Sequence, residues 1–215
     1  MKALAKAEAE LKKCRPHLAP WGRKQNDEWD QLTRFVYQVD NFEALQDKIA
    51  QSKADWPEGT AHYARNRWYN YWSARAIEQI FAQSPDVQPA SRLYDKQVDF
   101  SLQGIDFDHK TTVFPKNYGP SLAEAQLRPS ELMQWLYLHQ SSEGRQHFAN
   151  RLFVVLYHSE GYHYFLKAEL AWLQTKVEAY LANFDPQQLT VLYFAGQDTL
   201  TYCDAIWAVW EGNID

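Results

Sequence analysis

The chain has 215 residues, of which 46% are hydrophobic and 15% aromatic, and its formal net charge is −5. This composition is typical of a folded domain with a sizeable core, and it excludes a disordered or collagen-like chain. The acidic pI of about 5.8 provides no overall basic field, so contact with a nucleic acid would need a local basic patch or a metal ion.

The first 13 residues, MKALAKAEAELKK, have a charged helical pattern without the apolar segment of a signal peptide. The two cysteines, Cys14 and Cys203, have neither metal-binding nor redox spacing, which favours a reducing compartment. No apolar run reaches the length of a membrane span. We therefore expect a cytoplasmic protein without membrane contact.

The first half of the chain has helical periodicity in three segments, which are separated by turn signals. It predicts helices over residues 2–13, 27–51 and 60–83. The third segment holds Trp68, Tyr69, Tyr71 and Trp72, for which packing in a core is a better interpretation than stacking on bases.

The second half changes to strand-like alternation, interrupted by two helical patterns. It predicts strands over 96–103, 105–114, 151–158, 162–167, 188–194 and 201–210, and helices over 121–140 (with a break at Pro129) and 168–184. The order indicates a mixed α/β domain with one central sheet over residues 59–215, preceded by an N-terminal helical extension over residues 1–58.

The segment GIDFDHKTTVFP, with KQVDFSLQ before it, predicts a hairpin around a two-residue turn at Gln103-Gly104. The expected facing pairs are Leu102 with Ile105, Ser101 with Asp106, Phe100 with Phe107, and Asp99 with Asp108. Alternation then places the apolar residues on one face, and Asp99, Asp108 and Lys110 on the other.

Two facing carboxylates repel each other, so this arrangement needs a compensating cation. Lys110 supplies one, and a divalent metal ion would neutralise more, because carboxylate oxygens are ligands that Mg²⁺ and Mn²⁺ prefer. A solvated strand face with an ordinary surface ion pair is the alternative that spacing alone leaves open.

These residues resemble the motif of the PD-(D/E)xK nuclease superfamily, over roughly residues 62–158. The family pattern is an acid on one strand and (D/E)-x-K on the next, after a helix that often carries a glutamate. Asp99 matches the first acid, Asp108-His109-Lys110 matches the second element, and Glu78 matches the helix acid. The proline of the family name is absent, since Val98 precedes Asp99.

The resemblance implies a restriction-endonuclease-like αβββαβ core, with residues 92–95 or nearby forming its first strand. It also implies a metal-dependent DNA endonuclease, acting in restriction or defence against foreign DNA. Asp99, Asp108 and Glu78 would hold Mg²⁺ (or Mn²⁺), with the His109 carbonyl as a further ligand. Lys110 would position the attacking water and offset phosphate charge.

Several neighbouring residues have both a functional and a structural interpretation. Arg67 and Arg75 have near-helical spacing to Glu78 and are candidates for phosphate contacts, although pairing with acids of the protein is the simpler expectation. We interpret His109 as a packed histidine on the apolar face, and Arg151 as a structural ion-pair partner.

Two other functions remain open on the sequence alone. One is a catalytically inactive protein of the nuclease fold that binds a nucleic acid or a protein. The other is an adaptor whose N-terminal helices bind a protein partner. A homodimer is also compatible with the sequence, since nucleases that cut both strands often dimerise.

Overall fold

The computed structural model describes residues 2–20, 28–90, 98–139, 148–196 and 198–214. Contacts divide the chain into two compact units, a helical unit (Met1–Ile77 with Lys167–Ala171) and a sheet unit (Glu78–Leu166 with Trp172–Asp215). The division falls inside helix α4 (Thr60–Phe81), whereas the domain limits expected from the sequence are 1–58 and 59–215. No helix of the described ranges is long and apolar enough to span a membrane.

The helical unit contains more breaks than the sequence predicts. Its elements are α1 (Lys2–Cys14), η1 (Arg15–His17), α2 (Glu28–Leu32), η2 (Arg34–Tyr37), α3 (Phe42–Ser52), η3 (Lys53–Asp55) and most of α4. The single helix predicted over 27–51 is wrong, because Asn41 starts a new helix: its side chain accepts a hydrogen bond from the Ala44 amide at 2.8 Å. Asn favours such caps over helix interiors.

A short segment from the second half of the chain, Lys167–Ala171, belongs to the helical unit and is held there by charges. The Glu169 carboxylate, buried in this segment, binds Arg15 and also lies 2.8 Å from the ammonium of Lys12. The Ala171 amide, at the start of α7, donates to Glu8 at 2.7 Å. These contacts join distant parts of the sequence inside one unit.

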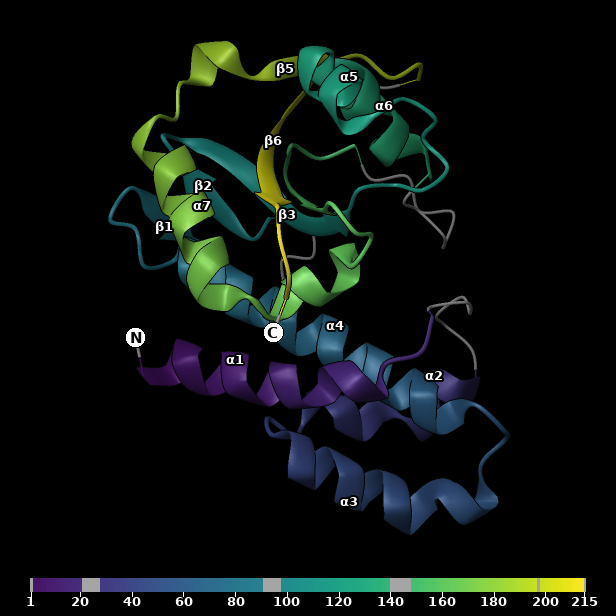
Figure 1. Cartoon of the computed structure of the whole chain (residues 1–215). Coiled ribbons are helices and arrows are strands. Elements are labelled where there is room, and N and C mark those ends of the chain that lie inside the picture. Colours follow the sequence, from purple (N-terminus) through teal and green to yellow (C-terminus); the bar gives the residue numbers. More distant parts are fainter. Residues whose placement is uncertain (1, 21–27, 91–97, 140–147, 197, 215) are drawn as a thin grey trace. The chain divides into compact units, whose positions relative to one another are not determined.

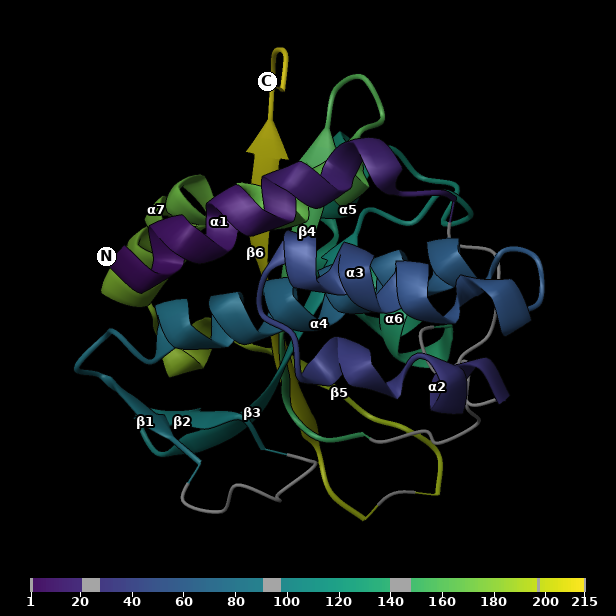
Figure 2. The same ribbon diagram turned by 90° about the horizontal axis from the view of Figure 1, so that it is seen from below.

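The sheet unit has one mixed sheet, as the sequence predicts, with six strands (Figures 1 and 2). Strand β1 was not predicted at its observed position, residues 87–89. Its strands are β1 (Val87–Pro89), β2 (Phe100–Leu102), β3 (Ile105–Val113), β4 (Arg151–His158), β5 (Thr190–Leu192) and β6 (Thr201–Trp210), in the order β1-β2-β3-β4-β6-β5. Strands β1, β2 and β3 form an antiparallel meander, β3, β4 and β6 are parallel, and β5 is antiparallel to β6. Residues 92–95 lie outside the described residues.

The helices of the sheet unit confirm one predicted break and correct one predicted strand. The helices are α5 (Leu122–Leu127), α6 (Pro129–His139), η4 (His163–Ala168), α7 (Leu170–Ala182) and η5 (Pro186–Gln188). Pro129 opens α6, where its missing N–H costs nothing. The strand predicted over 162–167 is wrong, because His163 turns back and its Nδ1 accepts the His158 amide at 2.8 Å, at the end of β4.

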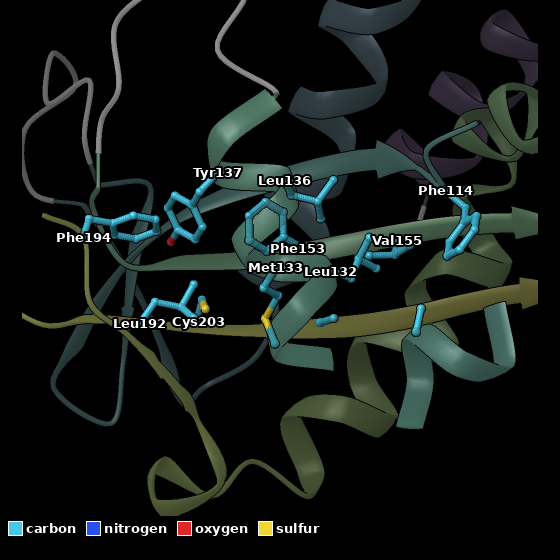
Figure 3. Close-up of a cluster of buried hydrophobic side chains, with 12 residues drawn as sticks. Phe114, Leu132, Met133, Leu136, Tyr137, Phe153, Val155, Leu192, Phe194 and Cys203 are labelled. Atoms are coloured by element: carbon cyan, nitrogen blue, oxygen red, sulfur yellow. The ribbon is translucent and has the colours of Figure 1, made fainter. Parts of the chain in front are cut away.

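Side chains alternate between two covered faces of the sheet. On one face, Phe153, Val155 and Cys203 pack with α6 residues such as Met133 and Tyr137 (Figure 3). On the other face, Phe100 and His109 pack against Phe81 at the end of α4, and Phe107 packs against Phe184 after α7. The middle of strand β3 is thus buried on both faces. The face to which each buried residue points therefore determines which side chains it can contact.

The predicted register of the β2–β3 hairpin is confirmed for three of the four expected pairs. Phe100 pairs with Phe107, Ser101 with Asp106, and Leu102 with Ile105. Gln103 and Gly104 both have positive φ angles, 48° and 81°, as a type I′ turn requires. The turn fixes the register, and the register fixes which β3 side chains share a face.

The turn provides a test of this register. Gly104→Ala should lower the free energy of unfolding by about 1–2 kcal/mol, because an L-residue is strained at this φ angle. A Cβ there would meet no atom within 4 Å, so a steric clash does not contribute. Gln103→Asn is the matched variant and should raise stability by about 0.5 kcal/mol, because Asn tolerates positive φ. Urea unfolding measures both; equal stability of Gly104→Ala and the wild type would contradict the turn.

Candidate metal site

Three side chains that can bind metal lie close together at the β2–β3 end of the sheet unit. The ligand atoms of Glu78, Asp99 and His109 are all within 4.8 Å of one another. Glu78 comes from the last turn of α4, Asp99 immediately precedes β2, and His109 lies in β3. Two carboxylates and one imidazole from three elements form a donor set that suits a divalent cation.

A local irregularity turns Asp99 toward this cluster. The β2–β3 pairing ends at Phe100, and the Asp99 amide donates at 2.9 Å to the carbonyl of Phe107, the residue already opposite Phe100. Two residues opposing one is the arrangement of a β-bulge, which redirects a side chain. The predicted pairing of Asp99 with Asp108 is therefore wrong: the Asp99 carboxylate instead accepts the backbone N–H of His109 at 2.8 Å.

His109 is fixed in position by its neighbours. It is 4% exposed, and its ring lies 5.5 Å from that of Phe81. Its Nε2 is 2.8 Å from the hydroxyl of Thr111, two residues along the same face of β3. His109 is packed, as predicted from the sequence, and it is also adjacent to both carboxylates.

Asp108 points to the opposite face of β3, as strand alternation requires. Its buried carboxylate lies 2.8 Å from Arg151 Nε and 3.1 Å from Lys110 Nζ. The Arg151 guanidinium in turn lies over the ring of Tyr137, 4.8 Å from its centroid. Burial raises the pKa of the Tyr137 hydroxyl, with further contributions from Cys203 and Asp108. Asp108 is thus neutralised by two cations of the protein.

The structure divides the predicted catalytic set of Glu78, Asp99, Asp108 and Lys110 into two groups. Glu78 and Asp99 come together with His109, while Asp108 and Lys110 form an ion pair on the other face. The sequence contained one signal for His109, which occupies the apolar position after Phe107 in the alternation. Arg151 lies 43 residues from Asp108, and no local pattern connects the two.

The two arginines predicted to bind a nucleic acid have different surroundings. Arg67 is buried in the helical unit, where its guanidinium donates to the Asp30 carbonyl at 2.8 Å and to the Tyr37 hydroxyl at 2.6 Å. Arg67 also donates to Thr33 at 2.5 Å, so a phosphate contact by this residue is not supported. Arg75 is exposed on α4, and its contact with a nucleic acid stays a prediction.

A third carboxylate shares a row of the sheet with His109. His109 pairs with Leu152 in β4, and Leu152 pairs with Asp204 in β6. Asp204 accepts the Tyr180 hydroxyl at 2.9 Å and the Ala205 amide at 2.7 Å. Desolvation by burial raises the pKa of Asp204, although both of these hydrogen bonds oppose the shift.

Comparison with known proteins gives no further identification of this site. No family model, curated protein or solved structure matches the chain.

The ion pair on the α6 face has a measurable contribution to stability. Arg151→Met should lower the free energy of unfolding by about 3 kcal/mol, because it leaves the buried Asp108 carboxylate with the half-exposed Lys110 alone. The double variant Arg151→Met/Asp108→Leu should regain most of this loss. Urea unfolding of both single variants and the double variant gives the coupling energy. A coupling near zero would show that the pair contributes nothing.

The buried Asp204 should make stability depend on pH. Because its pKa is higher in the folded state, its favourable contribution is complete below its unfolded value, 3.8, and is lost as pH rises through the folded value. Asp204→Asn should therefore be more stable than the wild type at pH 7, because the amide carries no charge that burial disfavours. The gain should vanish near pH 3.5. Chemical unfolding across this range tests the trend, and a pH-independent difference would refute it.

Proposed function

We propose that this protein is a metal-dependent nuclease that hydrolyses phosphodiester bonds in DNA. The observation that carries the proposal is the convergence of Glu78, Asp99 and His109 from three elements of the sheet unit. The order of elements supports it as well: α4, β1, β2, β3, α6 and β4 follow the αβββαβ order of the restriction-endonuclease-like core. A role in restriction or defence against foreign DNA rests on the motif resemblance alone.

The residues of the site have separable roles in this proposal. Glu78, Asp99 and His109 would hold the divalent ion, Mg²⁺ or Mn²⁺, which when bound supplies an activated water and stabilises charge on the phosphate. Lys110 is about half exposed and pairs with Asp108 on the face of β3 opposite to His109, so it lies outside this ligand set.

Asp108 is best assigned a supporting role. Its carboxylate binds Arg151 and Lys110, and the resemblance had suggested it as a metal ligand. In the arrangement observed, Asp108 orients Lys110 and balances the charge of Arg151. Arg151 thereby stabilises strand β3 from the face opposite to the metal cluster.

The pairing of Asp108 with Arg151 and Lys110 favours a second candidate function. A nuclease-fold protein whose second acid is neutralised by its own cations could bind a nucleic acid or a protein without cutting. This candidate differs from the first in one respect that can be measured, which is turnover.

The direct test is cleavage of supercoiled plasmid and single-stranded DNA with Mg²⁺, Mn²⁺ or EDTA. We expect metal-dependent cleavage by the wild type. Asp99→Asn should reduce the rate by more than about a hundredfold, because loss of an outer-shell partner alone costs 10–100-fold. The matched control is Asp106→Asn, an exposed aspartate of the same hairpin that bonds Ser101 and should keep full activity.

Three results would decide between the candidates. Cleavage that is lost in Asp99→Asn and kept in Asp106→Asn supports the nuclease. Equal cleavage by both variants would place the activity elsewhere or in a contaminant. DNA binding by a folded wild type without cleavage in any metal would favour the inactive binding protein.

A further inference from the structure

We propose that His109 makes this site selective for a first-row transition-metal ion over Mg²⁺. The inference deepens the proposed function and rests on the same metal site, because it names the class of ion that the site takes. The sequence alone pointed to carboxylate ligands, for which Mg²⁺ and Mn²⁺ are both suitable. The structure adds an imidazole to the donor set in place of Asp108.

The chemistry of the donor atoms favours a transition metal. Imidazole nitrogen is a common ligand of first-row transition ions, whereas Mg²⁺ takes oxygen ligands almost exclusively. Mn²⁺ binds most weakly of the first-row divalent ions. If the site prefers even Mn²⁺ over Mg²⁺, the other first-row ions should be preferred as well, so Mn²⁺ gives the strictest test.

Burial of the site also favours a transition-metal ion over Mg²⁺. The His109 side chain is 4% exposed and packs beside Phe81, and Glu78 and Asp99 are half-buried. Mg²⁺ gives up its water shell reluctantly and usually keeps several waters. A site whose nitrogen donor is buried beside the Phe81 ring therefore disfavours Mg²⁺ on solvation as well as on ligand type.

The orientation of His109 is set before any ion binds. Thr111 lies 2.8 Å from Nε2, and Asp99 accepts the backbone N–H of His109 at 2.8 Å. A ring partner such as Thr111 fixes the imidazole and tunes its basicity in metal sites, whereas the Asp99 bond holds the backbone of His109. The contact with Asp99 also ties one ligand to the strand that carries another, which limits the freedom of the donor set.

Hydrogen bonds among the three side chains, without any ion, are the competing interpretation. A histidine beside two carboxylates can be held in this way in the interior of a protein. Only the metal-site interpretation predicts that the three side chains bind an ion. Metal binding can be measured directly, without any assay of catalysis.

The test compares the binding of Mn²⁺ and Mg²⁺ by isothermal titration to the full chain. For the wild type we expect Mn²⁺ to bind at least about tenfold more tightly than Mg²⁺. His109→Asn replaces the nitrogen donor with an amide oxygen and should bring the two affinities together. Thr111→Val keeps the ligand and should weaken Mn²⁺ binding about tenfold. The matched control is His139→Asn on α6, an exposed histidine bonded to the Trp135 carbonyl, which should change neither affinity.

A spectroscopic signature complements the titration. Pulsed electron paramagnetic resonance of bound Mn²⁺ should show coupling to a ¹⁴N nucleus in the wild type and in His139→Asn, and none in His109→Asn. Circular dichroism establishes that each variant is folded.

The outcomes separate this inference from the proposed function. Mn²⁺ preference with ¹⁴N coupling, both lost in His109→Asn, supports the inference. Equal binding of both ions, unchanged in His109→Asn, would overturn it while leaving a carboxylate-based nuclease intact. Absence of binding by either ion to the folded wild type would overturn both and favour the hydrogen-bonded cluster.

Discussion

The middle of strand β3, from Phe107 to His109, is buried on both faces, and this constraint determines the chemistry around it. Because successive side chains of a strand point to opposite faces, each buried polar residue of β3 must find a partner on its own face. Asp108 meets this requirement through Arg151 and Lys110, and His109 meets it through Thr111 and the neighbouring carboxylates. Two charged or polar groups therefore lie back to back across one strand, each with its own set of partners.

The bulge before β2 assigns Asp99 to one of these two sets. In a regular ladder, Asp99 would oppose Asp108 and the two carboxylates would repel each other. With the bulge, Asp99 instead accepts the His109 amide and lies next to the imidazole. A shift of one residue in backbone pairing thus replaces a repulsive pair with a mixed donor set, without any change in the sequence of the strand.

Much of the sheet could be predicted from local patterns, because turns and alternation are local. The Gln103-Gly104 turn, the register of the hairpin and the break at Pro129 follow from residue types at adjacent positions. The break at Asn41 was missed because the apolar stripe around it continues at helical spacing, although its side chain caps a new helix. The site was predicted only in part: Glu78 and Asp99 were named, but the bulge has no residue signature that outweighs regular alternation. The role of Arg151 depends on the parallel pairing of β3 with β4, which only the assembled sheet defines.

The distribution of buried arginines bears on how an acidic chain could approach a polyanion. Arg15 is paired with Glu169, Arg67 is held by Asp30, Thr33 and Tyr37, and Arg151 is paired with Asp108. These cations stabilise the interior of their own units and contribute little attraction at the surface, in a chain whose net charge is −5. In the proposed nuclease, a divalent ion would therefore do more than activate water. It would convert a cluster of two carboxylates, which repels phosphate, into a site whose charge permits a phosphodiester to approach. Substrate binding and catalysis would then depend on the same three side chains.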